Sequence, residues 1–352
     1  MTTSTADDLL RQVSVNATDV DSDELPATWA LPGLAERGLL DLGIAELLAE
    51  GTRDDVRDEA RLIAAIAQEC VASAFSLWAH RMVLDYLARG ERSARTAELL
   101  TDLRAARRIG STAMAAGLKT LAGIGEVELR AQRCADGWSL TGPIAWASNL
   151  VPGSVFVAPA RTETGQVIVA WIHTDTEGVH VFPARGLLAL DATASGGLKL
   201  DQVRVADDQV IANDLVSLAA GFKPAFLVLQ SSFCAGLITR SLHEAEASLD
   251  RGDNTVLASD VAHARASVEE FLQQWQRLAA DLAAASRREL LQLRLDASAL
   301  AIRVTRLEST LAGGRGYATK SPASRRFREA AFLPVQSPSE GHLRWELASL
   351  PH

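Results

Sequence analysis

The sequence predicts an α+β protein of several domains, in which a small β-domain stands between two helical domains. Helical periodicity extends to about residue 108, short β-branched runs bounded by Gly, Pro and Asp follow to residue 208, and helical periodicity then returns. With 352 residues, 48% of them hydrophobic and 22% charged, the chain can bury cores of this size. We therefore expect an N-terminal helical domain (1–108), a middle antiparallel β-barrel or sandwich (109–208) and a C-terminal helical bundle (209–352).

The N-terminal domain should contain buried helices. Residues 31–42 form one short helical pattern that ends near Gly43. The longer stretch from Arg57 to Gly90 is rich in alanine, free of proline and apolar on most faces. It therefore predicts one or two buried helices that end at Gly90.

Four β-branched runs predict strands of the middle domain. They are VFVAPA (155–160), VIVAWI (167–172), VHVF (179–182) and LKLDQVRV (198–205). The last run alternates apolar and polar residues, as a half-exposed strand does. Turn-forming residues separate the runs, so antiparallel pairing is expected.

Two apolar sets with helical spacing predict long helices in the C-terminal domain. The first set is Val261, Ala264, Val268, Phe271, Trp275, Leu278 and Leu282, and the second is Leu293, Ala297, Leu300, Val304, Leu307 and Leu311. Each set lies along one side of a helix, which is typical of antiparallel bundles.

Charge and composition exclude several partners. The formal net charge is −9, whereas nucleic acid or an anionic membrane would need a basic face, so we expect neither partner. The N-terminal sequence lacks a basic region followed by an apolar run, so no signal peptide is expected, and no apolar run reaches the roughly 18 residues that span a bilayer. Three scattered cysteines, Cys70, Cys134 and Cys234, form no disulfide framework. We therefore expect a cytoplasmic protein.

Familiar metal and nucleotide motifs do not occur in the sequence. The seven histidines are dispersed, and no HExxH, CxxC, GxGxxG, Walker or GxSxG pattern is present. No metal site is therefore expected, and we interpret His80 and His243 as packing or surface positions.

Two short stretches have both a structural and a cofactor-binding interpretation. GRGYA (314–318) follows the last long helical pattern, so its glycines either cap that helix or let the backbone approach a phosphate. In WSLTGPIAWASN (138–149), Trp146 either fills the core or stacks on a flat cofactor. Ser148 and Asn149 either end the strand or bond to the edge of that cofactor.

The C-terminal stretch SPSEGHLRWEL (337–347) also has two interpretations. Ser337 or Ser339 could cap a helix with Glu340 in its first turn, where the helix dipole favours an acid. Alternatively, Glu340 is a catalytic base, because a carboxylate with a raised pKa can remove a proton from carbon.

Three stretches of the chain resemble acyl-CoA dehydrogenases, and the likeness covers nearly its whole length. They are GLLDLGIAE (38–46), DGWSLTGPIAWASN (136–149) and LAGGRGYATKSPASRRFREAAFLPV (311–335). The third is the most specific, because it runs without a gap through both the glycines and Arg328-Glu329-Ala330. The resemblance implies a C-terminal four-helix bundle that encloses FAD with the other two domains. It also implies a homodimer or homotetramer and a small acyl substrate such as a CoA thioester.

The resemblance implies roles for individual residues. Trp146 would pack against the flavin ring, Ser148 would hydrogen-bond near its N5 edge, and Asn149 completes the same cofactor-binding motif. Thr112 would face the pyrimidine side of the flavin.

Residues nearer the C-terminus are implied as well. Gly313 and Gly314 would let the chain pass the FAD pyrophosphate or ribose, and Ser339 would touch the cofactor. In the family, a Glu followed by Gly-Thr removes the α-proton of the thioester. An alignment without a gap puts Ser337 at that position, and Glu340 reaches it only if three residues are inserted.

The chain departs from the family pattern at several cofactor and substrate contacts. Thr112-Ala113-Met114 replaces Thr-Glu-Pro, and Gly117-Leu118-Lys119 replaces Gly-Ser-Asp. Thr310 stands where the family has Gln, and Gln230 where it has Arg. These replacements weaken the expected recognition of FAD and of a CoA thioester.

Three functions therefore stay open at this point. The first is an FAD-dependent dehydrogenase acting on the CH–CH bond of an activated acyl compound, with Glu340 as its base. The second is a flavin-dependent monooxygenase, which needs no α-proton base and so accommodates Ser337. The third is a catalytically inactive paralogue that binds or assembles with another protein.

Overall fold

The computed structural model describes residues 3–351 and begins with six helices. These are α1 (Thr3–Asp21), α2 (Leu31–Glu36), α3 (Ile44–Glu50), α4 (Arg57–Glu69), α5 (Val71–Arg89) and α6 (Ala94–Arg104). The alanine-rich stretch from residue 57 to 90 forms α4 and α5, which are separated at Cys70, whose extended backbone breaks the helix. Gly90 follows the end of α5, as the sequence predicts.

The helix predicted over residues 31–42 is shorter than expected. It ends at Glu36, because Gly38 adopts a left-handed φ of 64° just beyond it. The Leu39 N–H donates to Leu34 O at 2.9 Å and the Gly38 N–H donates to Ala35 O at 3.0 Å. This pair of bonds is a Schellman cap, which a glycine favours because it has no Cβ.

The middle of the chain forms one eight-stranded sheet. Its strands are β1 (Gly110–Thr112), β2 (Arg130–Cys134), β3 (Gly137–Ala147), β4 (Val155–Thr162), β5 (Val167–His173), β6 (Val179–Pro183), β7 (Gly196–Ala206) and β8 (Val210–Ala212), with α7 (Ala115–Leu121) after β1. The order is β6-β7-β3-β2-β4-β5-β8, and β1 also pairs with β4.

The sheet is mixed and not purely antiparallel. Most neighbouring strands run antiparallel, but β1 and β2 each pair parallel with β4. Parallel neighbours need a long connection. Here α7 and the β2–β3 hairpin supply that connection between β1 and β4.

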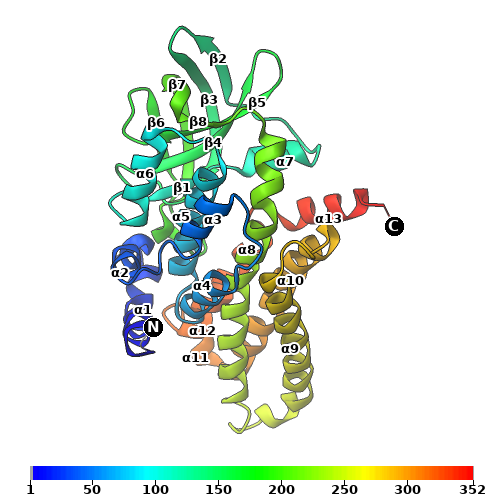
Figure 1. The fold of residues 1–352 in the computed structure, drawn as a ribbon. Coiled ribbons are helices and arrows are strands. Elements are labelled where there is room, and N and C mark those ends of the chain that lie inside the picture. The colour runs from blue at the N-terminus through cyan, green and yellow to red at the C-terminus, as the bar shows by residue number, and fades with distance from the viewer. Residues whose placement is uncertain (1–2, 352) are drawn as a thin grey trace.

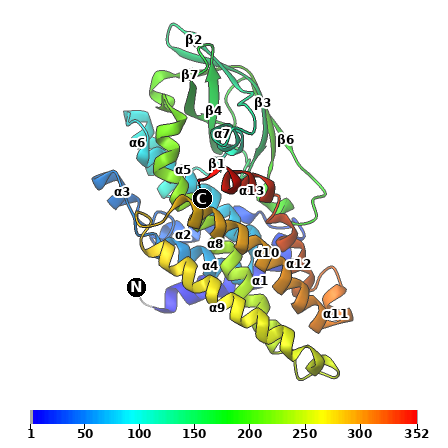
Figure 2. The ribbon, with the colours of Figure 1, turned by 90° about the vertical axis from the view of Figure 1, so that its right-hand side faces the viewer.

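The C-terminal helices complete the chain. They are α8 (Leu215–Glu246), α9 (Ala258–Ala280), α10 (Arg287–Ala312), α11 (Gly314–Tyr317), α12 (Pro322–Phe332) and α13 (Glu340–Ser349). The two predicted periodic sets lie on α9 and α10, except for Leu282, which follows the end of α9 at Ala280, and most of their members are buried. Figures 1 and 2 show the sheet at one end of the molecule and the long helices α8, α9 and α10 at the other.

Helix α8 is the central helix of the molecule. It packs along α4 and α10, and Gly236 allows the close approach, because a Cβ at that position would lie 2.1 Å from Ala64 O. By length and composition α8 could cross a membrane, but 89% of its apolar window is buried inside the protein. Its apolar surface is therefore accounted for by core packing.

The buried side chains form two cores. One core joins the N-terminal helices to the C-terminal helices. The other is formed mainly by residues of the strands. Trp171 of β5 belongs to the first core although it lies in the sheet, so the helices pack directly on one side of the sheet. The fold is thus helical, β and helical in sequence, with the two helical parts packed together in space.

Candidate functional site

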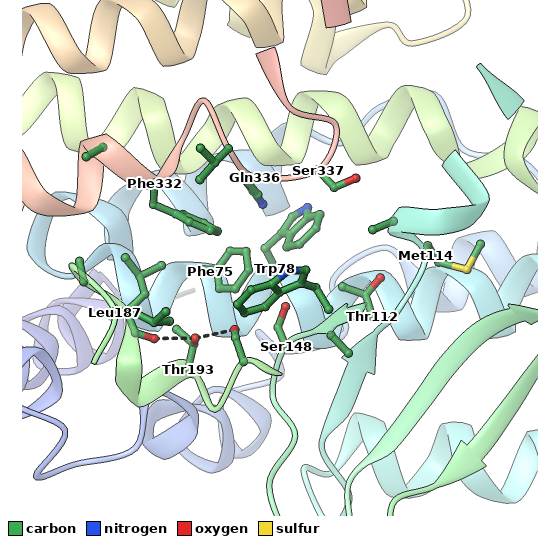
Figure 3. A pocket seen from close by; sticks show the side chains of 18 of the residues that line it. Phe75, Trp78, Thr112, Met114, Ser148, Leu187, Thr193, Phe332, Gln336 and Ser337 are labelled. Atoms are coloured by element: carbon green, nitrogen blue, oxygen red, sulfur yellow. Dashed lines mark hydrogen bonds between the residues drawn. The ribbon is translucent and has the colours of Figure 1, made fainter. Parts of the chain in front are cut away.

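A cavity of about 430 Å³ lies where the sheet meets the helices. The end of β1, the end of β3 and residues 187–195 form one side, and α5, α8 and the segment after α12 form the other. Its surface is mostly apolar, as small-molecule sites usually are. Figure 3 shows Thr112 and Ser148 on one side of this cavity and Gln336 and Ser337 on the other.

Aromatic side chains from three helices form a rigid part of the cavity surface. Phe75 and Trp78 of α5 stack with their ring centres 5.6 Å apart. Phe332 of α12 meets Phe75 edge-on at 5.3 Å, and Phe226 of α8 meets Trp78 edge-on at 5.0 Å. Offset and edge-on pairs of this kind are favourable arrangements, so the surface is well ordered for a flat apolar ligand.

Strand β3 brings Trp146 and Ser148 to the cavity. Trp146 is 54% exposed, which is unusual for so large an apolar side chain, and it lines the cavity together with Ser148. The Ser148 side chain is mostly buried, and its hydroxyl forms no hydrogen bond within residues 3–351. Both residues are therefore available to a ligand, as the cofactor-binding interpretation requires.

Asn149 has a different environment from its neighbour. It is fully buried, with a left-handed φ of 57°. The Ser76 hydroxyl donates to Asn149 Oδ1 at 2.6 Å, and Asn149 Nδ2 donates to Ser76 O at 2.9 Å and to Gly110 O at 3.1 Å. Its amide therefore ties the end of β3 to α5 and β1, and Asn149 does not line the cavity.

Thr112 lines the cavity at the end of β1. Its hydroxyl lies 3.1 Å from the Tyr86 hydroxyl, which is fully buried beneath it. Burial raises the pKa of Tyr86 above its ordinary value, so this phenol stays protonated and can donate to Thr112.

The opposite side of the cavity is a loop held by buried polar side chains. Gln230 Nε2 donates to Ser337 O at 2.9 Å. Arg294 donates to Gln230 Oε1 at 3.2 Å, to Leu333 O at 2.8 Å and to Gln336 Oε1 at 3.1 Å. Burial lowers the pKa of the Arg294 guanidinium below its ordinary value. These bonds fix where Gln336 and Ser337 face the cavity.

Helix α13 anchors the far end of the same loop. Glu346 is fully buried and accepts hydrogen bonds from Lys223 Nζ at 2.8 and 2.7 Å. Arg287 donates to the same carboxylate, and His342 Nε2 lies 2.9 Å from it. Burial disfavours the charged form, but these contacts outweigh it and lower the pKa of Glu346 to about 2.

Acidic side chains are missing from the cavity surface in the described part of the chain. Within residues 3–351, Arg328 is the only charged residue that lines it, and its guanidinium donates to Asp21 Oδ1 at 2.9 Å. Ser337 lines the cavity at the position where the alignment without a gap places the family's catalytic Glu.

Glu340 lies at the start of α13 and does not line the cavity. Ser339 is the N-cap, and its hydroxyl accepts a hydrogen bond from the His342 N–H at 3.4 Å. The Glu340 carboxylate accepts from Arg344 at 2.8 Å and is 42% exposed. The helix-start interpretation of this stretch is confirmed, whereas a catalytic role for Glu340 and a cofactor contact for Ser339 stay predictions.

Gly313 and Gly314 lie at the end of α10, away from the cavity. Gly313 caps the helix with a φ of 61°, and its N–H donates to Thr310 O at 3.1 Å. A Cβ at either position would meet no atom within 4 Å. The cap interpretation applies to the glycines of GRGYA (314–318), but the structure places the cap one residue earlier, at Gly313, and Gly314 begins α11. Contact with FAD stays a prediction for both Gly313 and Gly314.

Several cavity residues have no signal of their own in the sequence. Phe75, Trp78 and Phe226 lie in helices that are apolar on nearly every side, so periodicity does not show which of them face a cavity. The spacing of Phe75 and Trp78, three residues apart on one helix, is the one pattern that could have paired them. Gln336 and Arg294 are 42 residues apart and meet only in the fold.

Comparison with known proteins identifies the fold. No protein-family model matches the sequence, and no curated protein matches it. Glutaryl-CoA dehydrogenase in complex with glutaryl-CoA superposes with a TM-score of 0.85 and 17% identity, over 98% of this chain and 93% of that one. PigA with FAD and proline superposes with a TM-score of 0.82 and 17% identity, over 99% of this chain and 97% of that one. Dibenzothiophene monooxygenase from Paenibacillus sp. A11-2 superposes with a TM-score of 0.73 and 17% identity, over 98% of this chain and 95% of that one.

These likenesses span nearly the whole of every chain compared. The chain therefore has the acyl-CoA dehydrogenase fold, as the three resembling stretches implied. At these identities the likeness establishes the fold, and the chemistry has to be argued from the cavity itself.

Proposed function

We propose that this chain is a flavin-dependent oxidoreductase whose FAD ring lies in the cavity against Trp146, Ser148 and Thr112. The fold supports this, since a neighbour with the same fold is described with FAD. The cavity volume of about 430 Å³ lies within the usual range for small-molecule sites. The exposed indole of Trp146 and the free hydroxyl of Ser148 suit the face and the edge of a flat, polar-rimmed ring.

The residues present fit the flavin ring better than they fit the rest of FAD. Asn149 has no free polar atom, so we assign it to holding β3 in place and not to the cofactor. Gly313 and Gly314 do not line the cavity, so any contact between them and FAD would come from a part of the cofactor outside it or from a second copy of the chain. The second case would agree with the proposed homodimer or homotetramer.

Bound flavin would accept a hydride from a substrate. When reduced and supplied with oxygen, it would instead transfer one oxygen atom to a substrate. The chain contributes the aromatic surface that orients a flat substrate and excludes water. Ser148 would donate a hydrogen bond at the ring edge, and the loop at Gln336 and Ser337 would close the other side of the site.

Among these reactions the geometry favours monooxygenation. The observation that carries this choice is that no carboxylate among the described residues lines the cavity. The alignment without a gap also puts Ser337 at the position of the family's base. A serine without a partner base cannot remove a proton from carbon. Oxygen transfer needs no such base: one oxygen atom enters the substrate, the other leaves as water, and reduced flavin provides the two electrons.

Dehydrogenation of an acyl thioester is the second candidate. The likeness to glutaryl-CoA dehydrogenase bound to glutaryl-CoA favours it. Glu340 would be the base, in which case the loop between α12 and α13 would have to move to bring its carboxylate into the cavity. In either case we expect a cytoplasmic enzyme that acts on a small molecule.

An FAD titration followed by absorption spectroscopy tests the proposal. We expect bound flavin, and we expect Trp146→Ala or Ser148→Ala to weaken its affinity about tenfold, the effect of losing one stacking or hydrogen-bonding contact. Trp138→Ala, at the other end of β3, is the matched control and should leave the affinity unchanged. A protein that binds no FAD would contradict the proposal and support a binding or assembly role.

Two further measurements separate the reactions. Under anaerobic conditions, bleaching of the oxidised flavin by a panel of acyl-CoA thioesters would establish dehydrogenation. With reduced FAD and air, an oxygenated product from an aromatic substrate would establish monooxygenation, and we expect this second result.

A further inference from the structure

The cavity is lined by three hydrogen-bond donors that have no acceptor within the described residues, two on the loop after α12 and one on α5. Gln336 Nε2, Ser337 Oγ and Trp78 Nε1 are each buried without a partner within residues 3–351. All three residues line the cavity. A buried donor without an acceptor is unfavourable, so three of them around one cavity indicate a ligand that brings acceptors.

Arg294 holds two of the residues that carry these donors, Gln336 and Ser337. Because its guanidinium donates to Gln336 Oε1 at 3.1 Å, the NH₂ end of that amide is the end left without a partner. Arg294 also donates to Gln230 Oε1, and Gln230 in turn donates to Ser337 O. The backbone at Ser337 is therefore fixed through the same arginine.

No carboxylate in the described part of the chain is hydrogen-bonded to Arg294. The residue is fully buried, its three hydrogen-bond acceptors are a carbonyl and two amides, and Nη1 has no partner within residues 3–351. The carbonyl of Leu333 at the end of α12 contributes only the partial negative charge of a helix terminus. A buried cation with neutral partners favours an anion nearby.

Among the described residues, no anion lines the cavity. The one charged residue among those that line it within 3–351, Arg328, is positive and is already bound by Asp21. The side of the cavity next to Gln336 and Ser337 is therefore both rich in donors and positive in potential. Its charge is therefore opposite to that of a site whose catalytic base is a carboxylate.

We propose that Gln336, Ser337 and Trp78 form a subsite for an anionic oxygen of the substrate, a carboxylate or a phenolate carried on a flat apolar body. The inference rests on the proposed function and names its substrate class. The apolar body lies against Phe75 and Phe332, and Arg294 is a positioning residue that acts through Gln336. In Figure 3 Gln336 and Ser337 lie across the cavity from Thr112 and Ser148, where the flavin is proposed.

Binding of 4-nitrophenol, measured without turnover and both with and without FAD, tests the subsite. The phenolate absorbs at longer wavelength than the phenol, so binding to a positive, donor-rich site should increase the phenolate band at fixed pH. We expect 4-nitrophenolate to bind at least about tenfold tighter than neutral nitrobenzene, the difference that one charge-assisted hydrogen bond makes. Equal binding of the two, or none, overturns the inference.

Competition distinguishes the two sources of the oxygen. Displacement of 4-nitrophenolate by phenylacetate, but not by phenylacetamide, assigns the subsite to carboxylates. Displacement by neither assigns it to phenolates. Displacement by both with equal affinity overturns the preference for an anion.

Gln336→Glu is the decisive variant, because it keeps the shape and gives Arg294 a carboxylate. We expect the protein to stay folded, with an unchanged or higher melting temperature, and to lose at least about tenfold in affinity for 4-nitrophenolate but not for nitrobenzene. Gln132→Glu on the exposed face of β2 makes the same change at a distance and should alter neither affinity. Retention of the phenolate band shift in Gln336→Glu overturns the inference.

The subsite and the proposed function can fail separately. Anion-selective binding by a protein that binds no flavin would support the anion subsite and contradict the proposed oxidoreductase function. Oxygenation of neutral substrates with no preference for anions would support the proposed oxidoreductase function and contradict the anion subsite.

Discussion

Two adjacent residues show how strongly the surroundings of a side chain decide its role. Ser148 and Asn149 follow the end of β3 at Ala147, and both belong to the stretch that resembles a cofactor-binding motif. The Ser148 hydroxyl is free and lines the cavity, whereas the Asn149 amide is used entirely by Ser76 and Gly110. Loss of Asn149 would leave those buried groups without partners, so its importance is to stability.

His80 is a buried histidine with a similar structural role. Its Nδ1 accepts a hydrogen bond from the Gly110 N–H at 2.9 Å, and its Nε2 lies 3.1 Å from Leu103 O. The ring therefore bonds in its neutral form to β1 on one side and α6 on the other. Burial lowers the pKa of His80 from 6.5 to about 4.

This lowered pKa predicts a loss of stability in acid. The unfolded chain takes up the proton first, so the contribution of His80 is present above its unfolded pKa of 6.5 and is lost as the pH falls towards about 4. We expect this loss to be about 3 kcal/mol in the free energy of unfolding, from a shift of about two and a half pKa units. Urea unfolding at about pH 7 and about pH 4 measures it.

The His80→Gln variant isolates this contribution. Glutamine does not titrate, so the gap in stability between the native protein and the variant should shrink as the pH falls. His243→Gln, at an exposed position on α8, should show no such change. A constant gap between the native protein and His80→Gln would mean that another group controls the acid sensitivity.

At the scale of elements, the packing of α4 against α8 depends on one glycine. A Cβ at Gly236 would lie 2.1 Å from Ala64 O and 2.7 Å from Ala67 Cβ. The first neighbour is backbone and cannot move without shifting α4. Gly221, on the same helix, faces only the flexible side chain of Arg89, with Cδ at 3.4 Å.

The same substitution should therefore have opposite effects at these two positions. Gly236→Ala forces the helices apart, and we expect it to cost on the order of 2–4 kcal/mol in the free energy of unfolding, within the range of overpacked cores. Gly221→Ala should be neutral or add up to about 1 kcal/mol, because alanine favours a helix. Chemical denaturation of both variants measures the contrast. Equal effects at the two positions would show that the helix propensity of alanine, and not the clash with Ala64 O, controls the change in stability.

The elements of the fold follow from local patterns, and the cavity does not. The periodic sets on α9 and α10 and the β-branched runs of the sheet predict their elements because each pattern reports one buried face. Helices α5 and α8 are buried on nearly every side, so the same signal could not show that Phe75 and Phe226 face a cavity. The parallel pairs of β4 and the bond between Arg294 and Gln336 join distant segments, which local patterns do not register.

For the whole molecule, the arrangement of the cores differs from the order of the chain. The N-terminal and C-terminal helices share one core, and the sheet has another. Phe233 of α8 contributes to the shared core through edge-on contacts to Phe75 at 6.2 Å and Trp78 at 6.1 Å. The two helical regions, separated by about a hundred residues of sheet, should therefore behave as one cooperative unit.

Phe233→Ala tests this cooperativity. Truncating a fully buried phenylalanine costs about 3–5 kcal/mol, and we expect that loss to appear in α4, α5, α8 and α10 together when hydrogen exchange is measured in mild denaturant. The strands β4 and β5, whose interior is the second core, should keep more of their protection. Phe156→Ala removes an equally buried ring from that second core, so it should reverse the pattern. Independent opening of α4 and α5 after Phe233→Ala would show that the N-terminal helices form a unit of their own.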